Sequence, residues 1–479
     1  MTASHPTGVA QDLAPAPATG KLQGNLGVAG VAFMVLAAAA PLTVIGGNIP
    51  LGIGLGNGPG APMGFVIASA VLLLFSIGFV AMTPHVSEAG AFFSYVSKGL
   101  GERAGMGIAL VALITYTAIQ VGIYGYMGWA VNDTVKTYGG PDIPWPVYAF
   151  LTLAVVACLG YRHINLSARV LGIALACEVL VVVAMSAMIF ATGGAAGVNV
   201  ESFKPSVFLH GSLGVAVLFG LTGFIGFEAT AVFRDEAHDP ARTIPRATYW
   251  SVLLLGSFYA VACWALVIAQ GTDHIKEVAN DTLAGKGNLL LDSAQAYLGM
   301  VGRDIVNVLL ISSLFACVLS FHNVLARYQY VLSRKRLLPE ALGRVHVRHE
   351  SPHLSSIVQT LTAAVILAIF AALHLDPLVS VFGSMAGVAT VGMVLLLSAT
   401  SAAVYVFFSR HRELAGGRRF RSRIAPALAF VGLLGCAALV LSNFTLLTGG
   451  SVAVSLVLAA LPFLALLVGM ARGQHPLRP

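Results

Sequence analysis

Three glycines and one glutamate interrupt a long apolar run in the middle of the chain, in the stretch GLTGFIGFEAT from Gly220 to Thr230. Glycine costs about 1 kcal/mol relative to alanine inside a helix. A charged side chain at bilayer depth costs about 2.5–3.5 kcal/mol on insertion scales. Such a residue is expected where it serves a purpose. Glu228 is therefore a candidate proton carrier or counter-charge for an amine. Its alternative role is a structural lock that accepts hydrogen bonds from backbone N–H groups.

Few other ionisable side chains lie deep in apolar runs. Glu178 lies about twelve residues into its run, which is about 18 Å along a helix. It is a candidate second proton site, or else a brace for a neighbouring helix. His322 titrates in the range useful for proton handling, but an interhelical histidine is the simpler interpretation. Ser320, with Ser312 and Ser313, could offer hydroxyls to a sodium or proton-linked site, or could simply join helices.

A second interruption lies in the first apolar run, VAFMVLAAAAPLTVIGGNIP. Pro41 removes a backbone donor and clashes with the preceding turn, and Gly46 and Gly47 follow it. The pattern predicts that helical order fails between Ala40 and Gly47. A lone kink in a membrane helix is usually only a kink, but paired interruptions in corresponding spans indicate a transporter's binding site.

Unwound backbone inside a membrane must face protein or a water-filled cavity, because lipid cannot satisfy its polar groups. Half-helix N-termini suit a carboxylate, and half-helix C-termini suit an ammonium group or a small cation. A zwitterionic α-amino acid carries both groups. The predicted substrate-binding residues of the two interruptions are Leu42, Thr43, Val44, Ile45, Gly46, Gly47, Thr222, Gly223, Phe224, Ile225, Gly226 and Phe227.

Tyr116, Gln120 and Tyr124 recur every four residues in the third apolar run and so share one face of a helix. Such a face could line a substrate cavity, and Tyr116 and Gln120 are the candidates. Ordinary packing is the alternative.

The elements that must position these residues are membrane spans. The chain of 479 residues is 57% hydrophobic and 10% charged, against about 25% charged in soluble domains. Apolar runs of about 18 residues or more are counted as spans. Twelve are predicted, at 28–50, 62–83, 105–131, 144–160, 166–191, 208–233, 247–270, 303–330, 354–374, 377–408, 424–442 and 450–471.

The charge distribution orients these spans. With a cytosolic N-terminus, 22 of the 27 basic residues fall on the inner side, as the positive-inside rule expects. Both termini are then cytosolic. One loop, 271–302, is too polar to span and contains NLLLDSAQAYLG, which predicts an amphipathic helix on the outer face. The predicted division is a disordered tail 1–25, a first repeat 26–191, a second repeat 208–408, two further spans in 424–471, and a tail 472–479.

Several functions are disfavoured. No Walker-type sequence or nucleotide domain is recognised, and no repeated filter suggests a channel. The arginines are scattered through short loops rather than gathered for nucleic acid. The five cysteines lack metal-ligand spacing. No cofactor or metal is expected beyond H⁺ or Na⁺ as coupling ion. The expected partners are a small-molecule substrate and the lipid bilayer, with the chain a monomer or homodimer.

Three motifs resemble those of the amino acid–polyamine–organocation permeases. GFIGFEATAVFRDEAHDPARTIPRAT (223–248) is similar to that family's sixth-span signature, PHVSEAGAFFSYVSKGLGERAG (84–105) to its segment between spans two and three, and ARYQYVLSRKRLLPEALGRVHVRHESPH (326–353) to its loop after span eight. The chain departs from the family in three places. PLTVIGG stands where many relatives carry a Gly-Ser-Gly-Ile-type sequence, and span five holds Glu178 where some proton-coupled relatives hold a lysine. After span eight, RKRLLP lacks the family's frequent glycine, a minor change in a cytosolic turn.

The resemblance implies an all-α, LeuT-like membrane fold: five-plus-five inverted repeats with interrupted helices one and six, and two additional helices. It places span three beside the site. It implies secondary active transport of amino acids by alternating access in the cytoplasmic membrane, by proton coupling or exchange. A polyamine or cationic amine exchanger is the alternative, favoured if Glu228 or Glu178 faces the cavity without a cationic neighbour. A membrane enzyme is a remote alternative, because no catalytic cluster is recognised.

Overall fold

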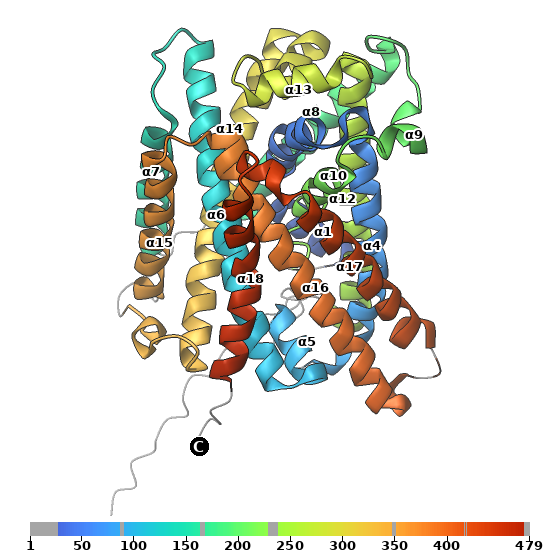
Figure 1. Cartoon of the computed structure of the whole chain (residues 1–479), viewed down its shortest axis with the longest axis vertical. Helices are drawn as coiled ribbons and strands as arrows, with labels where there is room; N and C mark the ends of the chain where they lie inside the picture. Colours follow the sequence, from blue (N-terminus) through green and yellow to red (C-terminus); the bar gives the residue numbers. More distant parts are fainter. Residues whose placement is uncertain are drawn as a thin grey trace, which may run out of the picture.

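The computed structural model of the chain describes residues 27–86, 91–162, 168–228, 238–346, 351–415, 417 and 419–473. All regular elements in these residues are helical, and the long helices form one bundle (Figure 1). Nine described helices are long and apolar enough to cross a membrane, and two shorter ones are also apolar. The long elements are α4 (Pro62–Met82), α6 (Glu102–Thr137), α7 (Trp145–Tyr161), α8 (Ala168–Thr192), α12 (Pro240–Gln270), α14 (Leu289–Arg334), α15 (His353–Ala372), α16 (Ser384–Arg410), α17 (Ala425–Ser442) and α18 (Val452–Arg472).

This architecture confirms a polytopic helical membrane protein. Short elements connect the long ones: η4 (Thr83–His85), α5 (Ala91–Leu100), η5 (Glu201–Phe203), α9 (Pro205–Phe208), α13 (Ile275–Leu283), η7 (Glu340–Gly343), η8 (Pro377–Gly383), η9 (Arg412–Ala415), η10 (Phe420–Ile424) and η11 (Phe444–Thr448). Twelve spans and their inverted symmetry stay a prediction.

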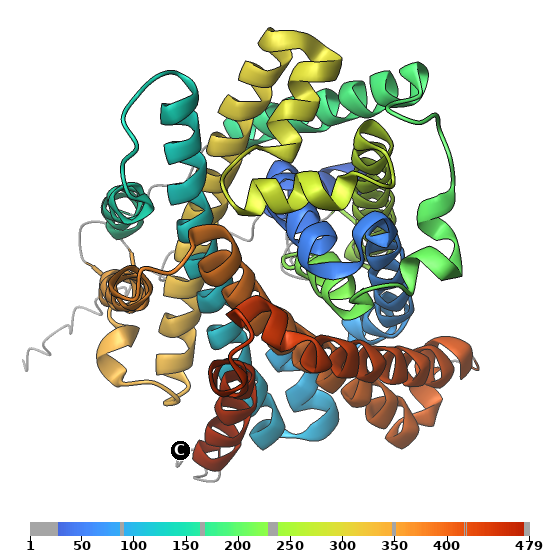
Figure 2. The same ribbon diagram turned by 45° about the horizontal axis from the view of Figure 1, so that its top comes forward.

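Helix α6 is the central element. In the most apolar window of α6, 83% of residues are buried, against 28% in α15 and 17% in α18. Helices α7 and α15 lie side by side at one edge in both views (Figures 1 and 2). The face of α6 that carries Tyr116, Gln120 and Tyr124 is therefore buried in the core, whereas α15 and α18 lie at the periphery.

The long polar connection after α12 is ordered. Helix α13 lies across the end of the bundle (Figure 1) and packs on the first span: a Cβ at Gly54 would lie 2.8 Å from Asn280 Oδ1. The predicted amphipathic helix is present as the first part of α14, and Gly299 (φ 75°, ψ −177°) separates it from the rest of that helix. Helix α13 was not predicted, because its short polar sequence has no long apolar run.

The first span is interrupted at one residue. Helix α1 (Val28–Ala38) ends three residues before Pro41, and Ala40 adopts a left-handed conformation (φ 47°, ψ 72°), which is uncommon for a residue with a Cβ. Pro41 then opens a new helix, where its missing N–H is not needed. The helix continues through α2 (Pro41–Thr43), η1 (Val44–Asn48) and α3 (Ile49–Leu51) into η2 (Gly52–Asn57), partly as π turns. A kink at Gly56 (φ −96°, ψ −127°) precedes the short η3 (Gly58–Gly60).

The break thus lies at the first residue of the predicted window. The prediction that helical order fails somewhere between Ala40 and Gly47 is therefore confirmed, with the break at the start of that window. Proline begins the second half-helix instead of disrupting it, so the following residues stay helical.

The sixth span breaks as predicted. Helix α10 (Leu213–Thr222) begins at Ser212, whose hydroxyl accepts the N–H of Val215, and it ends at Thr222. A series of turns from Gly223 to Glu228 follows, with Gly226 at φ 108°. Residues 229–237, with part of the sixth-span signature, lie outside the described residues.

The two interrupted spans meet. The side-chain amide of Asn48 donates to the carbonyl of Phe219 at 3.0 Å. A Cβ at Gly52 would lie only 3.8 Å from Cβ of Phe219. The two half-helices therefore pack directly against each other beside α6, and they place both breaks in the core.

Candidate functional site

A small cavity lies where the two interrupted spans cross. Its volume is about 30 Å³, comparable to the space that one water occupies in the liquid. The lining comes from both interrupted spans and from α6, α14 and η8: Ala39, Thr43, Val44, Asn48, Ile119, Ile123, Thr222, Ile225, Cys317, Phe321 and Phe382. None of these described lining residues is charged. An amino acid fits here only after side chains move apart.

Three polar side chains line this cavity. The hydroxyl of Thr43 is buried and has no hydrogen-bond partner among the described residues. Asn48 is held by Phe219. The hydroxyl of Thr222 donates to the carbonyl of Leu218 at 2.8 Å and lies 2.5 Å from that of Thr390 on α16. Thr43 therefore has the free hydrogen-bonding capacity in this cavity.

The break of the first span is joined to two other helices by a carboxylate. Glu178 of α8 accepts the backbone N–H of Leu42 at 3.2 Å through its Oε2 atom. The same oxygen accepts the hydroxyl of Ser313 of α14 at 3.0 Å. Leu42 carries the first N–H of the new half-helix, because Pro41 has none. Glu178 thus caps this half-helix from outside.

The break of the sixth span carries its own carboxylate. Oε2 of Glu228 accepts the N–H of Gly226 at 3.0 Å, and Oε1 accepts the hydroxyl of Tyr116 at 2.5 Å. The ring of Tyr116 lies 6.1 Å from that of Phe321, centroid to centroid, and Phe321 lines the cavity. These two hydrogen bonds match the structural lock given as the alternative for Glu228, one side chain away from the cavity. The proton-carrier role of Glu228 stays a prediction.

Comparison with known proteins identifies the family of the chain. Residues 26–470 match the sequence model of a family described as amino acid permease. The chain belongs to this family. It is part of the amino acid–polyamine–organocation superfamily, as the three motifs indicated.

The names of relatives of this permease state different substrates. The branched-chain amino acid permease BcaP of Bacillus subtilis is 24% identical over 62% of this chain and 65% of its own length. The serine/threonine exchanger SteT of the same organism is 22% identical over 68% and 75%. The cationic amino acid transporter 6, chloroplastic, of Arabidopsis thaliana is 24% identical over 67% and 56%. The chain thus spans less than two thirds of the length of BcaP.

Two predicted glycines of the permease are packing positions. A Cβ at Gly46 would lie 2.4 Å from the hydroxyl of Tyr126, and one at Gly47 would lie 2.8 Å from Phe382 Cε1. Both lie inside the π turn η1, in helical backbone. Among the predicted residues, four line the cavity: Thr43, Val44, Thr222 and Ile225. The other eight predicted residues of the two interruptions are not part of its lining: Leu42, Ile45, Gly46, Gly47, Gly223, Phe224, Gly226 and Phe227.

Gln120 and His322 of the permease face other helices. The Oε1 atom of Gln120 accepts the side-chain amide of Gln359 of α15 at 2.7 Å. The Nε2 atom of His322 lies 2.8 Å from the hydroxyl of Ser356 of the same helix. Neither lines the central cavity, and both join α15 to the bundle. This geometry matches the interhelical alternative for His322.

Ser320 is exposed on α14 and does not line the central cavity, so its position does not favour an ion site against the first span. Ser313, seven residues earlier, is buried and contacts Glu178. Ser312 is also exposed and donates to the carbonyl of Leu309.

Several cavity residues of the permease were not predicted from sequence. Asn48 lies one residue beyond the predicted window, and a lone polar side chain in an apolar run was a usable signal. Ile119, Ile123 and Phe382 are apolar residues in apolar spans, and no pattern distinguishes them from packing residues.

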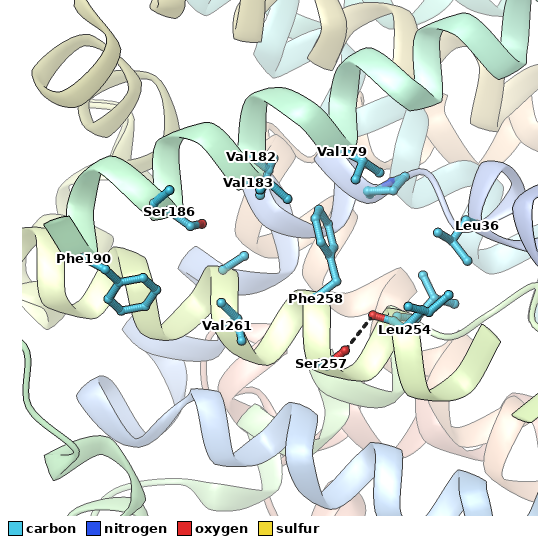
Figure 3. Close-up of a pocket in the computed structure, with 14 residues that line it drawn as sticks. Leu36, Val179, Val182, Val183, Ser186, Phe190, Leu254, Ser257, Phe258 and Val261 are labelled. Atoms are coloured by element: carbon cyan, nitrogen blue, oxygen red, sulfur yellow. Dashed lines mark hydrogen bonds between the residues drawn. The ribbon is translucent and has the colours of Figure 1, made fainter. Parts of the chain in front are cut away.

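A larger apolar groove lies at the lateral surface, between α8 and α12. Its volume is about 450 Å³, and Figure 3 shows the ring of Phe258 pointing from α12 toward α8. Its hydroxyls come from Ser186 and Ser257, and Ser257 already donates to the backbone carbonyl of Leu254. Such a surface offers little to a zwitterion, so the small central cavity is the candidate substrate site.

Proposed function

We propose that this permease is a secondary transporter that moves neutral amino acids with small or aliphatic side chains across the membrane by alternating access. The observation that carries the proposal is the uncharged cavity at the crossing of two interrupted spans. The apolar part of its lining suits an aliphatic side chain, and the cavity's small volume requires opening before substrate enters. The named substrates of BcaP and SteT, branched-chain residues and serine or threonine, fit this class.

The polar groups of a zwitterion have partners nearby. The buried hydroxyl of Thr43 is unpaired among the described residues and lines the cavity. The turns after Thr222 leave backbone groups outside a regular helix, and such groups can serve a ligand's ammonium or carboxylate. These contacts are the same for all α-amino acids, so the apolar lining sets the selectivity.

The alternative substrate class, cationic amines, has no carboxylate facing the cavity among the described lining residues. That alternative was favoured if Glu228 or Glu178 faced the cavity without a cationic neighbour. Each carboxylate instead accepts two hydrogen bonds from the protein, and neither belongs to the described lining. A diamine in the cavity would therefore lack a direct counter-charge, which is costly in a buried site.

We also propose proton coupling through Glu178. Its carboxylate joins the first span to α8 and α14 at the break, so its protonation would weaken both hydrogen bonds that hold the break closed. Hydrogen bonds to a charged acceptor contribute about 1.5–3 kcal/mol, more than those to a neutral one. Na⁺ coupling and Glu228 as the proton carrier are the competing mechanisms.

We also propose the orientation of the chain in the membrane. The predicted excess of arginine and lysine on one side places both termini in the cytosol and the protein in the cytoplasmic membrane. Labelling of single cysteines introduced in the 271–302 loop and in the C-terminal tail tests this orientation, after removal of the five native cysteines.

Counterflow in proteoliposomes tests the function. The panel contains leucine, valine, serine, lysine and putrescine, with proton and sodium gradients imposed separately. We expect exchange of at least one neutral amino acid, stimulated by the proton gradient, and none of putrescine. Glu178→Gln is expected to retain counterflow and lose proton stimulation, whereas the exposed control Glu277→Gln keeps both. Exchange of putrescine alone would refute the proposed substrate class.

A further inference from the structure

A cavity with three arginines lies at one end of the bundle, away from the central site. Its volume is about 580 Å³. Helix α4 with η4, helix α12, and the connection from α16 to α17 enclose it: Ile77, Val80, Ala81, Pro84, Arg242, Pro245, Arg246, Tyr249, Phe408, Leu414, Ala415, Arg421 and Ser422. The proposed transport does not use this cavity.

The described charged residues that line this arginine cavity are all positive. None of its described lining residues is acidic. Arg246 and Arg421 are exposed and have no ion-pair or hydrogen-bond partner among the described residues, and Arg242 makes a long contact of 3.8 Å with Asp239. Arg246 comes from α12 and Arg421 from η10, so the two guanidinium groups approach the cavity from different elements. Planar guanidinium groups recognise phosphate oxygens through paired hydrogen bonds.

Apolar stripes lead from the arginines along the bundle. On α12, Arg246, Tyr249 and Leu253 recur at helical spacing and share one face, and Leu253 is 47% exposed. On the other side, Arg421 is followed by Ile424 and Leu428, each 49% exposed, at the same spacing. Exposed apolar side chains on spans of this length face lipid hydrocarbon.

Helix α4 forms the floor between these two stripes. It packs against both α12 and α17, and it contributes Ile77 and Val80 to the cavity. The exposed rings of Trp250 and Phe420 flank the stripes close to the arginines, and tryptophan in particular is enriched at headgroup level. The surface therefore has a cationic end at the interface and apolar sides that continue into the bilayer.

We infer that this cavity binds the headgroup of an anionic phospholipid, with Arg246 and Arg421 on the phosphate and the acyl chains along Leu253 and Ile424. Charge complementarity and continuity with the lipid-facing surface select this occupant. Basic pockets between membrane helices bind anionic headgroups in this manner. The inference holds for any transported substrate, because it needs only that these helices span a bilayer.

The test measures lipid retention by the purified full-length chain. Dioleoyl phosphatidylglycerol and dioleoyl phosphatidylcholine, which share acyl chains, are titrated separately and bound lipid is counted by native mass spectrometry. The test variant is Arg246→Gln with Arg421→Gln. The matched control is Arg103→Gln with Arg344→Gln, which removes the same charge from exposed arginines outside the cavity. Inorganic phosphate is titrated in a third arm.

We expect preferential binding of phosphatidylglycerol by the wild type and the control, and about tenfold weaker binding by the test variant. Equal weakening in the control would indicate diffuse attraction and overturn the proposal. Arginine-dependent binding of inorganic phosphate without preference for phosphatidylglycerol would replace the lipid with a soluble anion. Arg421→Gln alone, in a connecting segment, serves if the double variant is not monodisperse, with the same expected direction.

Discussion

The two interrupted spans satisfy the backbone N–H groups freed at their breaks in different ways. The first span breaks at Ala40, and its freed N–H at Leu42 is bound by Glu178 from another helix. The sixth span breaks after Thr222, and the N–H of Gly226 is bound by Glu228 from the same turn. One cap acts between helices and the other is local.

This difference has a mechanical consequence. A cap between helices holds only while α8 and α14 keep their positions relative to the first span, so any movement of these helices changes it. The local cap travels with its own segment, although Tyr116 ties it to α6. If the cavity opens as proposed, we expect the hydrogen bonds at the first break to change more than the local bond at the sixth.

Glu178→Ala separates the two breaks most strongly. It removes the acceptor shared by Leu42 and Ser313 and leaves both donors buried. Leaving buried donors unsatisfied costs about 1–3 kcal/mol each. We expect loss of about 3 kcal/mol in unfolding free energy and loss of transport, measured by thermal unfolding in detergent and by counterflow. Glu178→Gln, which keeps an acceptor oxygen, should recover most of the stability; equal damage by both variants would argue against a capping role.

Two glycine substitutions test whether a glycine is required by a close packing contact or by its backbone conformation. Gly46→Ala places a Cβ against the hydroxyl of Tyr126, whereas Gly226→Ala forces alanine to φ 108°. We expect each to cost about 2 kcal/mol. Adding Tyr126→Phe should restore stability to Gly46→Ala, because it removes the contacting oxygen, and should not restore Gly226→Ala. Rescue of both, or of neither, in thermal unfolding would contradict the assignment.

Tyr116→Phe tests the link between the sixth-span break and α6. It removes the hydroxyl that donates to Glu228 and keeps the ring beside Phe321. The expected loss is about 1.5 kcal/mol, since the acceptor is a carboxylate. Tyr138→Phe, at an exposed position whose partner is Asp304, is the control and should change unfolding by much less.

The smallest effect is expected on α14. Ser313→Ala removes one of the two bonds to Glu178 and should cost about 1 kcal/mol in unfolding free energy. Ser320→Ala changes an exposed side chain and should be neutral within about 0.5 kcal/mol. A loss at Ser320 as large as that at Ser313 would contradict the assignment of Ser313 as the hydroxyl that stabilises Glu178.

The sequence was sufficient to locate both breaks but not to assign their residues. Pro41 and Gly226 indicate departures from regular helix, because the conformational preferences of proline and glycine can be read from the residue type alone. The partners of Glu178 and Glu228 depend on helices far apart in the chain, and no spacing rule connects Leu42 to Glu178. Buried packing contacts at Gly46 are likewise invisible until Tyr126 is placed beside it.

The serines of α14 show the same limit. Ser313 and Ser320 are seven residues apart, so helical periodicity puts them on nearly the same face. Only Ser313 is covered by neighbouring helices, because different elements pack at different heights along α14. Periodicity therefore predicts a face but not which part of that face is buried.

Equilibrium binding of neutral amino acids and putrescine to the purified permease and its Ile225→Phe variant tests the central claim most directly. Ile225 lines the uncharged cavity, and a phenylalanine there would fill the space that the ligand needs. The account predicts that the wild type binds at least one neutral amino acid and no putrescine. It also predicts binding about tenfold weaker or lost in a variant that remains folded. Equal binding by both proteins, or binding of putrescine alone, would contradict it.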